Sequence, residues 1–283
     1  ITKGGLPNKT LNIALAGTGV GKSLFMCHVA SSCLLQGRNV LYITCEMAEE
    51  KIAERIDANL LDIPIQQLQD PLLTKQKYRA KMDVLKKKTQ GKLVIKEYPT
   101  ASAHVGHFKA LLNELSLKKG FHPEIIFVDY LNICASSRYK GTIVNSYTYV
   151  KAIAEELRGL AGEYNVPILS ATQTTRSGYG NSNVEITDTS ESFGLPATAD
   201  LMFALISTED MEELNQIMVK QLKNRYNDPT VYKRFVLGID RQKMRLYDCD
   251  QNAQQDIIDS GIEPNQFNPP NAYPAKQFDD FKI

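Results

Sequence analysis

The sequence lacks the features that mark secreted, membrane-spanning and strongly charged proteins. None of its apolar runs approaches the roughly 18 residues that a helix needs to span a bilayer, and its N-terminus lacks the charged-then-apolar layout of a secretory signal. The five cysteines are odd in number, scattered and without a Cys-x-x-Cys spacing, so we expect reduced thiols rather than disulfides or a zinc site. The formal net charge of +1 over 283 residues gives no overall attraction to nucleic acid. These absences predict a cytoplasmic protein with no membrane partner, in which any nucleic-acid site is a local arrangement.

The sequence does contain short apolar runs that alternate with segments of helical periodicity. The runs are near-continuous, as in strands buried on both faces, and they cover residues 11–16, 40–44, 93–98, 125–130, 168–172 and 201–206. Apolar residues three and four apart mark the helical segments 22–36, 48–61, 103–119 and 147–164. Residues 218–225, 235–240 and 244–248 alternate around polar turns instead. This order predicts an α/β fold with a mostly parallel central sheet, helices on both faces and antiparallel strands added at one edge.

Composition separates a folded part, residues 1–250, from a tail, residues 251–283. The tail is rich in Gln, Asn, Asp and Pro, which predicts disorder. It ends in FDDFKI, whose two aromatics around acids suit docking on a partner protein, although an inert tail fits this composition equally well. Because the chain opens on Ile1 rather than Met, we expect that an N-terminal region of a longer protein is absent.

The stretch AGTGVGKSL, residues 16–24, lies between the first apolar run and the first helical segment. Its glycines allow the loop to curl so that backbone amides surround an anion, and the following helix start adds its positive dipole end. Lys22 would reach the β- and γ-phosphates and the Ser23 hydroxyl would hold Mg²⁺. This is the Walker A pattern with Ala16 in place of the first glycine, and a plain glycine turn is the alternative. It predicts a site for ATP or another NTP formed by Gly17, Thr18, Gly19, Val20, Gly21, Lys22, Ser23 and Leu24.

Two acidic residues follow buried strands and complete a hydrolytic site. Asp129 ends the apolar run IIFVD, which predicts a Walker B strand whose carboxylate meets the magnesium through water. Glu46 lies just past the run 40–44, at the carboxyl edge of the sheet where ligands of open α/β sheets bind. We predict that Glu46 orients and deprotonates water. A solvated glutamate at a helix start is the alternative for this residue.

Further polar residues are expected at the same edge of the sheet. Gln173 follows the run 168–172 and could sense the γ-phosphate, or be a simple loop amide. Lys223 and Arg225 are two apart on a predicted strand, so both project from one face. Such a pair could act on the nucleotide of a neighbouring subunit as an arginine finger, although exposed strand cations are the commoner explanation.

Two clusters of basic residues are better explained by structural roles than by binding a metal or DNA. His104 and His107 lie three apart without acidic or cysteine companions, so a helix start is favoured over a metal site. Residues 74–92 carry eight Lys or Arg and one Asp, which could form a DNA-facing patch. A solvated amphipathic helix is the alternative that we favour.

Taken together, these motifs resemble the RecA-like P-loop NTPase domain of DnaB-family replicative helicases, particularly its T-even-type phage members. The resemblance covers about residues 1–248 and is carried, besides residues 16–23, by CEMAEE (45–50), IIFVDYLNIC (125–134), NSYTYVKAIAEELRGLA (145–161), ESFGLPATADLM (191–202) and KQLKNRYND (220–228).

The resemblance implies a role for each matched residue. In this family the Glu after the second strand polarises the attacking water. The Gln that ends the strand after Walker B couples nucleotide state to the DNA-binding loops, and the Lys-x-Arg pair acts in trans on the γ-phosphate bound by the next subunit. These roles fall on Glu46, Gln173, and Lys223 with Arg225. Two loops that hold single-stranded DNA correspond to residues 174–183 and 188–195. The second loop includes Ser190, Glu191, Ser192, Phe193 and Gly194. Because Ser190 stands where bacterial relatives have Arg, we expect backbone amides and hydroxyls to hold the phosphates.

The resemblance implies an ATP- and Mg²⁺-dependent DNA helicase. It would act as a homo-hexameric ring that travels 5′ to 3′ on single-stranded DNA, with primase and other replisome proteins as partners, and in the infected bacterial host if phage-encoded. One alternative is a RecA-like recombinase or loader that forms filaments on DNA. The other is a non-catalytic nucleotide-binding scaffold, which would have no need for Lys22, Glu46, Asp129 and Arg225 together.

Overall fold

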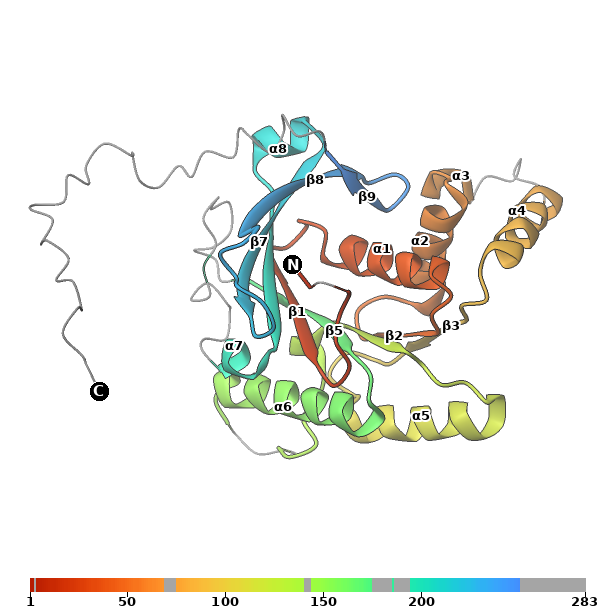
Figure 1. The fold of residues 1–283 in the computed structure, drawn as a ribbon. Coiled ribbons are helices and arrows are strands. Elements are labelled where there is room, and N and C mark those ends of the chain that lie inside the picture. The colour runs from red at the N-terminus through yellow and green to blue at the C-terminus, as the bar shows by residue number, and fades with distance from the viewer. Residues whose placement is uncertain (3, 69–74, 140–143, 175–184, 186–193, 250–283) are drawn as a thin grey trace, which may run out of the picture.

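The computed structural model describes residues 1–2, 4–68, 75–139, 144–174, 185 and 194–249, and these form a layered α/β domain (Figure 1). A nine-stranded sheet has the spatial order β3-β2-β4-β5-β1-β6-β7-β8-β9. Its strands are β1 Leu11–Ala16, β2 Val40–Thr44, β3 Leu93–Glu97, β4 Ile125–Asp129, β5 Ile168–Gln173, β6 Leu201–Ile206, β7 Gln216–Asn224, β8 Arg234–Asp240 and β9 Arg245–Asp248. The pairings from β3 to β6 are parallel, and β7 to β9 continue the sheet antiparallel. The predicted fold class is confirmed.

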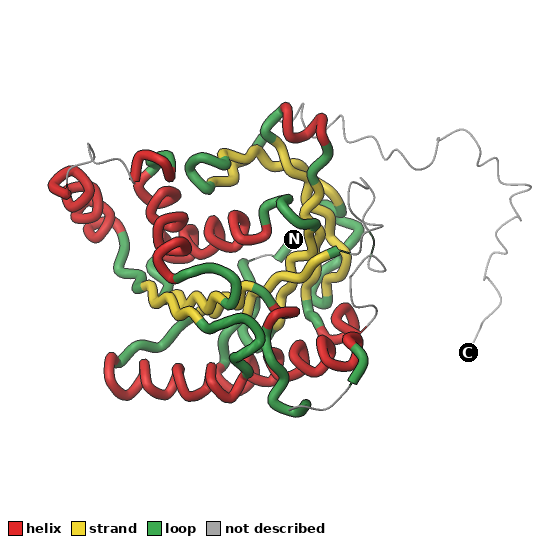
Figure 2. The backbone as a smooth tube through the Cα atoms, turned by 180° about the vertical axis from the view of Figure 1, so that it is seen from behind, coloured by secondary structure: helices red, strands yellow, loops and turns green. Residues whose placement is uncertain are grey.

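Helices cover both faces of the sheet (Figures 1 and 2). Helices α1 (Lys22–Leu35) and α2 (Glu49–Leu61) lie on one face, and α5 (Val105–Lys119) and α6 (Ser146–Tyr164) lie on the other. Shorter or peripheral helices are α3 Ile65–Leu68, α4 Lys75–Lys88, the 3-10 helix η1 Leu131–Ile133, α7 Gly194–Thr198 and α8 Glu209–Glu213. In the part of the chain that the structure describes, no helix has the length and apolar character required to cross a bilayer.

The central strand β1 separates two hydrophobic cores. Leu11, Ile13 and Leu15 belong to the core beneath α5 and α6. Ala14 and Ala16 belong to the opposite core, beneath α1 and α2. This alternation follows from the two-residue period of a strand, and the small alanines leave room for α1 to pack closely. The residues of β1 therefore set the position of the loop that joins it to α1.

Both basic clusters belong to helices, as the sequence predicted. His104 is the N-cap of α5, where its Nδ1 accepts a hydrogen bond from the Gly106 amide, while His107 accepts one from the His104 amide. No group of three potential metal ligands occurs among the described residues. The lysine-rich segment forms α4, which contacts α2 through Tyr78, whose hydroxyl donates to Asp57 at 2.5 Å. Most of the described α4 side chains are exposed.

Candidate nucleotide site and a second charged cluster

The loop between β1 and α1 has the geometry of an anion cradle. Gly19 and Gly21 have φ angles of 80° and 124°, which residues with a Cβ rarely adopt, whereas Gly17 is not in this region. Helix α1 starts at Lys22, and within the described chain it has no side-chain cap and no acidic residue in its first turn. The N–H groups and the positive dipole end of α1 are therefore available to an anion.

Lys22 is the buried cation of this loop. Its side chain is 9% exposed, and Nζ donates to the Gly17 carbonyl at 3.2 Å. Nζ also lies 5.9 Å from the centroid of the Tyr130 ring. Burial lowers the pKa of Lys22, while the nearby Glu46 and Asp129 carboxylates oppose this shift. Lys22 thus lies beside both of the predicted acidic residues.

Asp129, at the end of β4, has one satisfied and one unsatisfied carboxylate oxygen. Oδ2 accepts a hydrogen bond from the Tyr42 hydroxyl at 2.9 Å, and the fully buried Oδ1 has no hydrogen-bond partner among the described residues. Burial raises the pKa of Asp129, and hydrogen bonding by Tyr42 and Ser23 opposes this shift. A buried carboxylate with an unsatisfied oxygen beside a serine hydroxyl is the hard oxygen donor set that suits Mg²⁺.

Glu46 is exposed at the carboxyl edge of the sheet, two residues past the end of β2. A turn presents it, because Thr44 Oγ1 accepts a hydrogen bond from the Met47 amide at 3.0 Å and donates to the Met47 carbonyl at 2.8 Å. Helix α2 begins only at Glu49, with Ala48 as its N-cap. The helix-start alternative therefore describes Glu49 rather than Glu46.

Gln173 is the last residue of β5 rather than the first residue of a loop. It pairs with Ala16 across the parallel β1–β5 ladder, so it lies next to the beginning of the phosphate loop. Its Nε2 donates to the Tyr130 hydroxyl at 3.2 Å. The backbone amide of Thr174 donates to the Ala16 carbonyl at 3.3 Å and extends this contact by one residue.

Tyr42 and Tyr130 also belong to this cluster, although no sequence motif points to them. Tyr42 reads as one more apolar residue in a buried strand, although its hydroxyl reaches Asp129. Tyr130 follows the Walker B aspartate directly, and the Asp129–Tyr130 peptide is cis. Neither contact has a signal in the sequence, since the residues that meet lie 87 and 43 positions apart.

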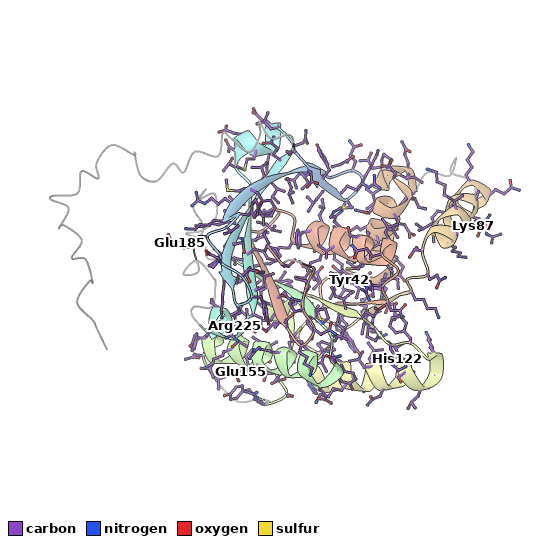
Figure 3. The ribbon with its side chains drawn as sticks, viewed as in Figure 1. Tyr42, Lys87, His122, Glu155, Glu185 and Arg225 are labelled. Carbon is purple, nitrogen blue, oxygen red and sulfur yellow. The ribbon has the colours of Figure 1, made fainter. Side chains whose placement is uncertain are left out.

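Lys223 and Arg225 do not lie at the carboxyl edge, which corrects the prediction. Strand β7 runs antiparallel to β6, so Lys223 pairs with Met202 near the start of β6. The phosphate loop follows Ala16, which pairs with Leu205 near the end of β6. Met202 pairs with Ile13, three residue steps before Ala16, which is about 10 Å at the rise of a strand. Arg225 lies beside Asp200, which bonds to the first residue of β1, so about 16 Å along the strand separates it from the loop. Figure 3 shows Arg225 beside α7 and α6, at this other end of the sheet.

The two cations nevertheless lie together, as the two-residue spacing predicts. Lys223 Nζ donates to the Pro196 and Ala197 carbonyls at 2.6 and 3.2 Å. Arg225, one residue past β7, donates to the Ala197 carbonyl at 3.0 Å and to Asp200 Oδ1 at 3.1 Å. Both side chains therefore cover the carboxyl end of α7.

Asp200 connects Arg225 to two further elements. Its carboxylate is 1% exposed in the ion pair, and it accepts hydrogen bonds from the Leu11 amide at 3.0 Å and from Arg158 of α6 at 2.9 and 3.0 Å. The buried charge is stabilised because each oxygen has more than one donor. Asp200 thereby fixes Arg225 relative to β1 and α6.

A groove of about 670 Å³ adjoins this cluster, between α6 and α7. The basic residues that line it are Lys9, Arg138, Lys151 and Arg158, against a single acid, Glu155. Glu155 pairs with Arg138 and Lys151, so part of this positive charge is compensated. The groove belongs to the end of the sheet that holds Arg225 and not to the phosphate loop.

The predicted DNA-binding loops fall largely outside the described residues. Ser190, Glu191, Ser192 and Phe193 are not among them, and of the segment 174–183 only Thr174 is described. Gly194 is the buried first residue of α7. An added Cβ would lie 2.9 Å from the Tyr147 ring and 3.1 Å from Lys151 Cβ, both on α6, so close packing of α7 against α6 accounts for this glycine.

The comparisons with known proteins all indicate the same family. A family profile described as the DnaB-like helicase C-terminal domain matches residues 2–234. The chain is 46% identical over 254 residues to a DnaB-like replicative helicase of Enterobacteria phage T4, which covers 89% of this chain and 54% of the relative. It is 25% identical over 205 residues to the replicative DNA helicase DnaB of Helicobacter pylori, 71% of this chain and 40% of that one. The chain thus spans about half the length of these relatives.

Solved structures agree on the fold at low sequence identity. A DnaB-like replicative helicase, described together with its interactions with primase, aligns with a TM-score of 0.71 at 16% identity over 87% of this chain and 59% of that one. A second solved structure, described as an ATPase domain, aligns with a TM-score of 0.70 at 16% identity over 86% of both chains. At this identity the likeness concerns the fold alone.

Proposed function

Since the chain belongs to the DnaB-like helicase C-terminal domain family, we propose that it is the ATP-hydrolysing motor of a replicative DNA helicase, which translocates on single-stranded DNA and unwinds duplex. The observation that carries this proposal is the convergence of Lys22, Glu46, Asp129 and Gln173 at the carboxyl edge of one parallel sheet. By family resemblance the motor works as a hexameric ring and travels 5′ to 3′.

Each residue of the nucleotide site has a proposed role that its position supports. The amides of residues 17–24 and Lys22 bind the triphosphate, and Lys22 leaves the Gly17 carbonyl to do so. Glu46 orients the attacking water and accepts its proton, for which its exposed position after β2 is suitable. Gln173, at the end of β5, responds to the γ-phosphate.

Ser23 and Asp129 would hold Mg²⁺, the latter through water. The unsatisfied Oδ1 of Asp129 fits this role because a metal-bound water would give it the missing donor. When bound, the ion neutralises charge on the β- and γ-phosphates. Tyr42 fixes the orientation of the carboxylate from the other side by donating to Oδ2.

Arg225 and Lys223 act on the nucleotide of a neighbouring subunit. Their location toward the amino end of the parallel strands supports this role, since along the strands about 10 Å separates Lys223, and about 16 Å separates Arg225, from their own phosphate loop. The adjacent basic groove supports the approach of an anionic surface at the same end. The guanidinium would supply positive charge to the transition state of the neighbour's reaction.

The remaining parts of the proposal rest on the family. Single-stranded DNA would contact the loops 174–183 and 188–195, with Glu191 and its neighbours among the contacts. Primase and other replisome proteins are proposed partners, and the tail 251–283 is a candidate docking segment.

A DNA-stimulated ATPase assay combined with sizing tests the function. Lys22→Ala should weaken nucleotide binding itself, whereas Glu46→Gln should keep binding and lower turnover by about 100-fold or more, because it keeps the shape and removes the base. Glu50→Gln, also exposed but on α2, is the matched control and should behave as wild type. Normal turnover of Glu46→Gln would contradict its role.

The same experiment separates the alternatives. Stimulation by single-stranded DNA together with rings in electron micrographs supports the motor, and open filaments would support a recombinase or loader. Absence of hydrolysis in a chain that binds ATP would indicate a scaffold.

A further inference from the structure

Tyr130 contacts two members of the nucleotide site that lie on different elements. Its hydroxyl accepts a hydrogen bond from Gln173 Nε2 at 3.2 Å, and Lys22 Nζ lies over its ring, 5.9 Å from the centroid. The side chain is 9% exposed, so both contacts are shielded from bulk water. One side chain therefore touches the phosphate-loop lysine with its ring and the β5 glutamine with its hydroxyl.

The two contacts use different parts of the tyrosine. The ring face attracts the Lys22 ammonium by a cation–π interaction, which requires an aromatic ring and no hydroxyl. The hydroxyl orients the Gln173 amide, which requires the oxygen. Burial, followed by the Glu46 and Asp129 carboxylates, raises the pKa of Tyr130, so the hydroxyl stays protonated and neutral.

On this basis, and resting on the function proposed above, we propose that Tyr130 is a positioning residue that links Lys22 to Gln173. In the structure Lys22 donates to the Gly17 carbonyl. A triphosphate in the loop draws the ammonium to its oxygens, which weakens its contact with the Tyr130 ring. Because the same ring carries the hydroxyl that holds Gln173, the change reaches the end of β5 in one step.

Backbone geometry favours this side chain as the connection. Gln173 and Lys22 lie on two elements that meet at the phosphate loop, since Gln173 pairs with Ala16 at its beginning. Tyr130 follows β4, which pairs with β5 on the side of β5 opposite to β1. Tyr130, directly after β4, thus contacts Gln173 of β5 and Lys22 of α1, and its two contacts connect these three elements.

The test separates ring from hydroxyl with variants of the full chain. Tyr130→Phe keeps the ring, Tyr130→Leu removes it, and Gln173→Ala removes the partner of the hydroxyl. Two quantities are measured for each: the Kd of a non-hydrolysable ATP analogue with Mg²⁺, and the ratio of turnover with single-stranded DNA to turnover without it. Tyr164→Phe, which loses a hydroxyl contact to Asn113 on the helical surface, is the matched control.

The ring contact predicts a rescue pattern in nucleotide binding. The ring contact stabilises Lys22 in the nucleotide-free state, so it opposes nucleotide binding. Tyr130→Leu should therefore lower the Kd by about 2- to 5-fold, the size of one cation–π contact, and Tyr130→Phe should return it close to the wild-type value. Equal Kd values for the Leu and Phe variants would overturn the Lys22 half of the proposal. If Tyr130→Leu does not fold, the Phe variant is judged by the second quantity alone.

The hydroxyl contact predicts shared effects on DNA stimulation. Tyr130→Phe and Gln173→Ala should each lower the stimulation ratio by about 3- to 10-fold, and the double variant should lose no more than either one. Losses that multiply in the double variant, or an unchanged ratio in Tyr130→Phe, would overturn the link. A wild-type chain that DNA does not stimulate contradicts the proposed function instead, and the same double-variant comparison on the nucleotide Kd then decides on Tyr130.

Discussion

At the scale of single residues, the site keeps a carboxylate in surroundings that disfavour its charge. Asp129 is fully buried, with one oxygen bonded to Tyr42 and the other without a partner among the described residues. Burial raises its pKa, which means that the folded protein disfavours the ionised form. Stability is thus lowered at the position that the proposed metal would occupy, a common property of binding sites.

Asp129→Asn should therefore stabilise the nucleotide-free protein while it disables hydrolysis. The amide keeps the shape and still accepts the Tyr42 hydroxyl, but it carries no charge. We expect the free energy of unfolding near pH 7.5 to rise by about 0.5–2 kcal/mol, measured by chemical denaturation without nucleotide or Mg²⁺. Asp83→Asn, on the exposed face of α4, is the control and should change it by less than about 0.5 kcal/mol.

The effect of Asp129→Asn should depend on pH with a defined sign. The folded pKa of Asp129 lies above the ordinary value of 3.8, so the folded protein binds this proton more tightly than the unfolded chain does. The contribution of Asp129 to stability is thus most favourable below pH 3.8 and weakens as the pH rises through the folded pKa. The stability difference between variant and wild type should grow over that interval and then stay constant. A difference that does not vary with pH would contradict this account.

At the scale of elements, one carboxylate connects three parts of the fold. Asp200 binds the amide at the start of β1, Arg158 of α6 and Arg225 at the end of β7. These elements are remote in sequence, and the ion pairs that join them are shielded at the carboxylate, which is 1% exposed. Asp200 therefore fixes the proposed trans-acting arginine on the core of the domain.

Asp200→Ala should be strongly destabilising. The change removes the partner of two arginines and of a buried amide, so we expect a loss of about 3–5 kcal/mol in urea unfolding. Glu163→Ala breaks the exposed Lys109–Glu163 pair and should cost less than about 1 kcal/mol. Similar small losses for both variants would show that the Asp200 cluster is only a surface network.

The elements and the mostly parallel sheet were largely predictable, while the end of the sheet that particular side chains reach was not. Strands such as β1 and β4 are fully buried on both faces, so their continuous apolar runs identify them within a residue or two. Side-chain alternation also shows that Lys223 and Arg225 share a face. It cannot show which end of the sheet they reach, because that depends on the antiparallel return of β7, a tertiary property.

Sequence motifs identified the site residues that such motifs contain. They did not identify the residues that join the site through contacts between separate strands. Gly-Lys-Ser after a strand and an aspartate at a strand end carry their own chemistry, which identified Lys22 and Asp129. Tyr42 and Tyr130 enter through hydrogen bonds between separate strands. Apolar patterning treats both tyrosines as core residues, and that description is also correct, since both belong to the hydrophobic core beneath α1 and α2.

At the scale of the whole molecule, the two proposed functional groups lie at opposite ends of the sheet. The phosphate loop follows the carboxyl end of β1, and Arg225 lies beside its amino end. Each chain thus has its proposed nucleotide site at one end of the sheet and the Arg225 cation at the other. Identical copies can combine them by joining unlike surfaces head to tail, which forms a ring when the rotation closes.

Mixing two inactive variants should restore activity. Arg225→Ala chains keep the phosphate loop, and Lys22→Ala chains keep Arg225, so some mixed interfaces contain both groups. We expect ATPase activity above the sum of the separate preparations once subunits have exchanged, with mixed assembly verified by mass. A ring structure with a transition-state analogue in which Arg225 contacts its own subunit's phosphates, or solvent, would refute the trans role even if mixing restores activity.

The separation of these two ends would also set how a population of the proposed rings responds to defective copies. A chain that lacks only Lys22 spoils the one interface in which it supplies the loop, so intact interfaces decline in proportion to the fraction of wild-type chains. A chain that lacks both Lys22 and Arg225 spoils the interfaces on both of its sides, so intact interfaces decline with the square of that fraction. Co-expression of the doubly defective gene should therefore be dominant over wild type at lower dosage than either single defect, a genetic consequence of the direction in which β7 returns along the sheet.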